Sequence, residues 1–125
     1  MRARRAIWFA AIVTVGLGTS GCVSSFSTEL PADTPDWLRE MVGSIAREPV
    51  TNPPTEIWAQ TYQGKTTYWR SSRCCDVYSE LYSASGALLC APDGGITGTG
   101  DGRCPDFADT ATDRRLIWKD RRSYP

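Results

Sequence analysis

The chain has 125 residues with 14 basic and 14 acidic side chains, so its formal net charge is zero. This balance excludes the strongly basic surface of nucleic-acid-binding domains, and we expect no nucleic-acid partner. The sequence contains no histidine. That absence excludes Ser–His and Cys–His catalytic pairs and the usual general base at neutral pH. The composition therefore favours a protein that is not an enzyme.

Residues 1–21 have the three parts of an export signal. The chain opens Met-Arg-Ala-Arg-Arg, continues without charge from Ala6 to Gly18, and then has small residues up to Cys22. The uncharged run is about 13 residues long, whereas a membrane-spanning helix needs roughly 20. We therefore predict a cleaved signal peptide over residues 1–21.

The four residues Thr19-Ser20-Gly21-Cys22 resemble the bacterial lipobox, in which the cysteine thiol receives a diacylglycerol anchor. Thr19 departs from the motif, which usually has Leu there, and secretion with a free Cys22 is the alternative. Val23 replaces the Asp that usually retains lipoproteins in the inner membrane. The resemblance implies a lipid-anchored protein of the cell envelope, on the periplasmic face of the outer membrane in a host with two membranes.

The cysteine count agrees with lipidation, because modification of Cys22 leaves an even four: Cys74, Cys75, Cys90 and Cys104. In an oxidising compartment these four predict two disulfides. A bridge between neighbours 74 and 75 is strained. Two pairings remain, 74–90 with 75–104 or 74–104 with 75–90. Adjacent cysteines do not match the ligand spacing of structural zinc sites.

Residues 22–33 are polar and aperiodic and predict a tether. A helix is expected over 35–47, because Thr34 offers a capping hydroxyl, Pro35 suits the first helical position, and apolar residues follow at helical spacing. Period-two patterns then predict β-hairpins over 55–62 with 65–70 and over 76–82 with 87–91. Leu116–Trp118 is a candidate closing strand, and residues 121–125 are expected to form a frayed tail. The prediction is one α+β domain over residues 34–120, with an N-terminal helix packed on about four antiparallel strands.

The segment from Pro92 to Pro105, called here the glycine-rich loop, contains five glycines in fourteen positions and cannot form a regular element. Its acids Asp93, Asp101 and Asp106 are candidate calcium ligands, since calcium requires six to eight oxygens. Asp-Gly pairs are also ordinary turn signals. The alternative is a loop without metal, held by a disulfide at Cys104.

Aromatic residues are dense on the predicted strands. Trp58, Tyr62 and Tyr68 would form a partner-binding patch if they were exposed together, while burial would make them core residues.

The motifs Cys74-Cys75-Asp76, Leu81-Tyr82, PDGGITGTGDG at 92–102 and LIWKD at 116–120 resemble a family of small uncharacterised bacterial exported proteins. The resemblance covers about residues 35–120 and implies a domain type without an activity. One helix on a sheet is also similar to cystatin-like and small protease-inhibitor domains, which is an analogy of fold alone. We expect a binding module for an envelope protein, peptide or glycan, with a protease-inhibitor-like or calcium-binding domain as alternatives.

Overall fold

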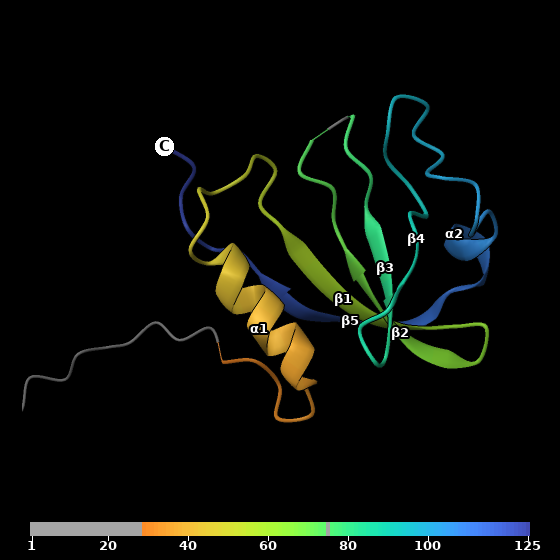
Figure 1. The fold of residues 1–125 in the computed structure, drawn as a ribbon, viewed down its shortest axis with the longest axis horizontal. Coiled ribbons are helices and arrows are strands. Elements are labelled where there is room, and N and C mark those ends of the chain that lie inside the picture. The colour runs from red at the N-terminus through yellow and green to blue at the C-terminus, as the bar shows by residue number, and fades with distance from the viewer. Residues whose placement is uncertain (1–28, 75) are drawn as a thin grey trace, which may run out of the picture.

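The computed structural model describes residues 29–74 and 76–125 (Figure 1). The elements, in chain order, are α1 (Asp36–Ile45), β1 (Glu56–Tyr62), β2 (Lys65–Arg70), β3 (Glu80–Ser83), β4 (Leu88–Cys90), α2 (Phe107–Thr110) and β5 (Thr112–Lys119). The strands form one antiparallel sheet in the order β4-β3-β2-β1-β5, so the last strand pairs with the first. The predicted α+β class is confirmed. The strand number is five instead of four, and the short helix α2 was not predicted.

The predicted signal peptide, Cys22 and the tether up to residue 28 lie outside the described residues, as does Cys75. Within the described part of the chain, no helix combines the length and the apolar character that crossing a membrane requires.

Helix α1 buries the face that the sequence predicts, with Leu38, Val42 and Ile45 turned toward the sheet. The predicted start is wrong in detail. Pro35 occupies the N-cap position, and no side chain caps the helix. The Thr34 side chain is buried instead, and its hydroxyl has no hydrogen-bond partner among the described residues. Packing beneath the helix thus overrides the local preference of threonine for a cap.

The first predicted hairpin is confirmed. Gln63 and Gly64 both have positive φ, 50° and 72°, as a tight two-residue hairpin turn requires. This turn places Lys65 opposite Tyr62 and therefore Tyr68 opposite Ala59. Because side chains alternate along a strand, Tyr68 shares a face with Ala59, and Tyr62 lies on the other face.

The second hairpin is shorter than predicted. The paired strands are β3 and β4, and residues 76–79 are not part of β3. They turn toward the glycine-rich loop, where Tyr78 forms an isolated bridge with Gly94 and the Ser79 amide donates to the Asp93 carbonyl. The segment that contains Val77 and Tyr78 therefore pairs with the glycine-rich loop instead of extending β3.

The sheet is apolar on both faces, and each face has its own cover. Helix α1 lies across one face in Figure 1 and packs on a core that includes Ile57, Ala59 and Tyr68. The second face carries a smaller cluster in which α2 and the end of the glycine-rich loop meet the strands. Its buried members are Tyr62, Leu81, Cys90, Cys104 and Phe107.

The candidate closing strand at 116–118 is confirmed as part of the longer β5, and the chain beyond β5 returns to the helix. Arg122 lies in the segment predicted as a frayed tail, yet its guanidinium donates to the carbonyls of Ile45, Ala46 and Glu48 at distances of 2.9–3.1 Å. It also donates to both carboxylate oxygens of the buried Asp120. Arg122 therefore donates to carbonyls at and just beyond the end of α1, where helix carbonyls lack intrahelical partners.

We expect Arg122→Ala to lower the melting temperature by roughly 5–10 °C, because hydrogen bonds to charged groups are among the stronger ones and the Asp120 carboxylate loses its side-chain partner, keeping only the amide of residue 122. Arg121→Ala removes a neighbouring exposed arginine and is the matched control. Circular dichroism melts of the three proteins measure the effect. Equal losses in the two variants would contradict the role of Arg122.

The same pair predicts a pH dependence. Hydrogen bonding to Arg122 holds the pKa of the Asp120 carboxyl below its ordinary value of 3.8, so folding favours the charged form. The stabilisation is complete above about pH 4 and is lost as the pH falls through the lower folded-state pKa. In denaturant titrations, wild type should exceed Asp120→Asn in unfolding free energy at pH 6, and the difference should shrink toward pH 3. A difference that stays constant over this range would refute the linkage.

Candidate functional site

The glycine-rich loop has a defined backbone conformation. All five of its glycines have positive φ, between 70° and 82°. Backbone hydrogen bonds close it internally, from Gly98 to Gly95 and from Gly100 to Gly94, and join it to the preceding chain, from Asp101 to Ala91. The loop is therefore a folded unit of the domain.

Two positions show why the loop needs glycine. A Cβ atom at Gly100 would overlap the carbonyl oxygen of Ala91, and a Cβ at Gly94 would overlap the carbonyl oxygen of Val77. Both obstacles are backbone atoms that cannot move aside, and both glycines also adopt a positive φ that favours glycine. The turns of the loop lie so close to the chain that other side chains do not fit.

Two carboxylates fix the base of the loop. The Trp69 indole donates to Asp93 at 3.0 Å, which links the loop to β2. Asp101 accepts from the Ala91 amide, the Arg103 amide and the Arg103 side chain at 2.8–3.1 Å. The hydrogen bonds from Arg103 hold the pKa of Asp101 below its usual value, so this carboxylate is charged at neutral pH.

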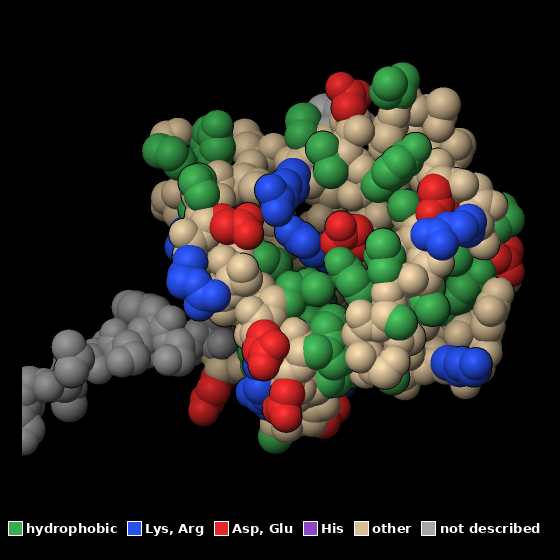
Figure 2. Space-filling model, in the orientation of Figure 1, with side chains coloured by type: hydrophobic (Ala, Val, Ile, Leu, Met, Phe, Trp, Pro, Cys, Tyr) green, Lys and Arg blue, Asp and Glu red, His purple; other side chains and the backbone are tan. Residues whose placement is uncertain are grey.

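The exposed tip of this region consists of Ile96, Val77 and Tyr78. Ile96 is 92% exposed, the largest exposure among the large hydrophobic side chains described, while Val77 and Tyr78 are about half exposed. The Tyr78 ring lies against Gly95, and the Gly95 amide donates to the Val77 carbonyl. Hydrophobic side chains also gather along the upper edge of the molecule in Figure 2, over these loops. The loop thus presents apolar side chains on an ordered backbone.

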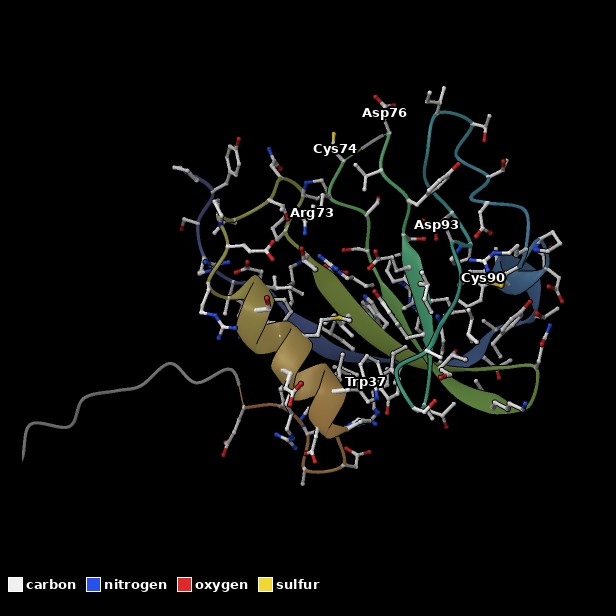
Figure 3. The ribbon with its side chains drawn as sticks, viewed as in Figure 1. Trp37, Arg73, Cys74, Asp76, Cys90 and Asp93 are labelled. Atoms are coloured by element: carbon white, nitrogen blue, oxygen red, sulfur yellow. A yellow bond between two sulfur atoms is a disulfide. The ribbon has the colours of Figure 1, made fainter. Side chains whose placement is uncertain are left out.

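Both predicted disulfide pairings are wrong, because Cys90 is joined to Cys104. Cys90 ends β4 and Cys104 ends the loop, and both lie in the buried cluster on the second face of the sheet. Cys74 is exposed on the segment after β2, at the top of Figure 3 and far from Cys90. The pairing follows from the return of the loop to β4, which cysteine spacing does not show.

The three predicted calcium ligands have separate partners. Asp93 accepts from Trp69, Asp101 from Arg103, and Asp106 from the Tyr62 hydroxyl at 2.7 Å. Across residues 29–74 and 76–125, no group of three or more His, Cys, Asp or Glu side chains is arranged to hold a metal ion. The geometry gives the calcium hypothesis no support.

The three predicted binding aromatics do not form one exposed patch. Tyr62 and Tyr68 are 4% and 7% exposed and lie on opposite faces of the sheet, while Trp58 is partly exposed. The hydrogen bond to Asp106 raises the pKa of Tyr62, with burial as the second cause. The Tyr62 hydroxyl therefore stays protonated and serves to hold α2 against the sheet.

Sequence reasoning missed the arginine that covers Trp58. The Arg114 guanidinium lies 4.3 Å from the centre of the Trp58 ring and 5.2 Å from that of Trp69. The two tryptophans are cross-strand partners. With β5 paired to β1, Arg114 can reach both rings as a cation–π partner. Only the β1–β5 pairing would have revealed this contact.

No curated protein and no solved structure matches the chain. A family model described as a domain of unknown function (DUF6970) matches residues 43–120. The matched region begins inside α1 and includes all five strands, the glycine-rich loop and both bridged cysteines. Since the match covers more than half of the sequence, the chain belongs to the DUF6970 family of domains of unknown function.

Proposed function

We propose that the protein is a lipid-anchored envelope protein that acts as a non-enzymatic binding module, with the glycine-rich loop as its contact with a partner protein. The observation that carries the proposal is the nearly complete exposure of Ile96 on a loop whose backbone is fixed at both ends. Removing an exposed apolar side chain from water does not carry the desolvation penalty of a charge. Its burial in a partner's pocket makes the free energy of binding more favourable.

Order in the free loop favours this role. Binding reduces conformational freedom, so a loop that already has its bound shape loses less entropy when it engages a partner. Three interactions restrict the base of the loop in the free protein: the Cys90–Cys104 bridge, the hydrogen bonds to Asp101 and the Trp69–Asp93 hydrogen bond. Val77 and Tyr78 widen the apolar contact beyond a single residue.

A protease-inhibitor-like module is the second candidate. A projecting loop with an exposed apolar residue, held by a disulfide at its base, could occupy the substrate groove of a protease without unfolding. In this case Ile96 would fill the specificity pocket. Inhibition assays against a panel of envelope proteases distinguish this candidate from other partners.

The lipid anchor rests on the resemblance of residues 19–22 to a lipobox and on the odd cysteine count. Glu29, the first described residue, follows Cys22 by seven positions, and extended chain spans at most about 25 Å over that length. In Figure 1 the described chain begins beside α1, away from the loop at the upper edge. An anchored domain would thus be held close to the membrane with its loop directed elsewhere.

We expect Ile96→Asp to abolish partner capture, because a carboxylate cannot enter an apolar pocket without losing its hydration. Leu88→Asp is the matched control, since Leu88 is 54% exposed on β4 outside the tip. Wild type and both variants are cross-linked to envelope extract of the producing cells, and the captured species are compared by mass spectrometry. A species retained by wild type and Leu88→Asp but lost with Ile96→Asp supports the proposal.

A second variant tests whether loop order matters. Replacing both Cys90 and Cys104 by Ala should speed amide exchange in the loop and weaken capture of the same species, although Ile96 is unchanged. Capture that is insensitive to Ile96→Asp would overturn the proposed contact.

Peptide mass spectrometry without reduction tests the anchor and the bridge in one measurement. We expect an N-terminal peptide that begins at Cys22 with diacylglycerol attached, together with a cross-linked peptide pair that contains Cys90 and Cys104. Cys22→Ser, produced in the same cells, should lose the lipid and appear in the soluble envelope fraction. An unmodified Cys22 in membrane-extracted protein would rule out the lipid anchor.

A further inference from the structure

A concave site lies at the opposite end of the sheet from the exposed tip. Its lining comes from two turns, the β1–β2 turn after Tyr62 and the β3–β4 turn after Ser83, and also includes Cys104. Figure 1 shows both turns at the lower end of the strands. The cavity volume is about 670 Å³, within the range of sites for small organic ligands. We call it the sheet-end groove.

The charges around the sheet-end groove have one sign. Lys65 and Arg103 line it, and no carboxylate is among the described residues that do so. Lys65 is exposed on β2. Arg103 gives only its Nε to Asp101 among the side-chain hydrogen bonds in the described structure, at 2.8 Å. The terminal nitrogens of its planar guanidinium remain available for a carboxylate.

The two nearby acids already accept hydrogen bonds within the domain. Asp106 accepts from the Tyr62 hydroxyl, and Asp101 accepts from two backbone amides as well as from Arg103. Neither carboxylate is among the described residues that line the groove. Their contribution is to hold Tyr62 and Arg103 in place.

The remaining lining favours a ligand with several hydroxyl groups. Gln63, Thr66 and Ser85 contribute uncharged polar side chains to the lining, and Leu89 contributes an apolar one. A sugar ring has an apolar face and hydroxyls at its edge, and these hydroxyls can both donate to and accept from such residues. A peptide would instead bind by adding a strand to a sheet edge, whereas turns close this groove.

From this combination we infer that the sheet-end groove binds an acidic saccharide, with its carboxylate between Lys65 and Arg103. This site is distinct from the Ile96 contact proposed above, since Ile96 lies outside the groove, although Arg103 and Cys104 of the loop line it. It adds a small-molecule ligand class to a domain that also presents an exposed loop.

Isothermal titration calorimetry of the full-length chain tests the inference, with digalacturonic acid as the acidic probe. We expect a Kd below about 1 mM, weaker binding at higher salt, and no measurable binding of the neutral disaccharide cellobiose. Lys65→Gln and Arg103→Gln should each weaken digalacturonic acid binding roughly 5–10-fold. Arg121→Gln removes an exposed charge outside the groove and should leave the Kd unchanged.

Two additions keep the outcome clear. Lys65→Glu reverses the charge of an exposed residue and should abolish binding, with a circular dichroism melt to verify folding. Ile96→Asp should bind digalacturonic acid as wild type does, which separates this site from the loop. The inference is overturned if cellobiose binds equally well, if inorganic phosphate displaces the acid at equal concentration, or if the Lys65 and Arg103 variants keep the wild-type Kd.

Discussion

The Cys90–Cys104 disulfide is the constraint on which both candidate surfaces depend. The chain between the two cysteines contains five glycines with positive φ, a composition that gives the unfolded loop large conformational freedom. A cross-link that closes a loop of this length removes about 3 kcal/mol of that freedom from the unfolded state. Because Cys104 lies near the end of the loop and also lines the sheet-end groove, one bond restrains the loop and the groove together.

The need for this bond follows from the two apolar faces of the sheet. Of the two helices in the described residues, only α1 is long enough to cover a face, and the second face is covered by α2, the loop and the bridge. Irregular backbone over a core must satisfy its own polar groups. Asp101 accepts from two backbone amides for that purpose. Where the loop does not reach, Arg114 lies over Trp58 and provides the cover.

The parts of the fold that depend on neighbouring residues could be predicted from the sequence. Helical spacing identified the buried face of α1, and Gln63-Gly64 identified the first hairpin. The register of that hairpin was also sufficient to separate Tyr68 from Tyr62, since a two-residue turn places Tyr68 opposite Ala59. The prediction of one aromatic patch did not take into account that the two tyrosines lie on opposite faces of the sheet.

The remaining features depend on contacts between distant segments, which spacing does not encode. Arg122 meets carbonyls more than 70 residues earlier in the chain. The disulfide pairing requires the loop to fold back on β4 and the segment at 76–79 to pair with the loop. The glycine-rich loop was identified as the special segment, but its exposed residue, Ile96, lacked any motif. Its position at the exposed tip is visible only once the loop has folded, when Ile96 remains 92% exposed.

Arg103 belongs both to the glycine-rich loop and to the lining of the sheet-end groove. Asp101 neutralises part of the charge of Arg103. Most of the electrostatic attraction for an anion would therefore come from Lys65. The same hydrogen bond, however, fixes the guanidinium plane, and a fixed fork recognises a carboxylate by geometry as well as by charge. Since Asp101 also holds the Ala91 amide, the orientation of Arg103 is tied to the folded base of the loop. Selectivity for a planar carboxylate over a spherical anion would therefore depend on the folded state of the loop, which orients Arg103. Lys65 would attract both kinds of anion.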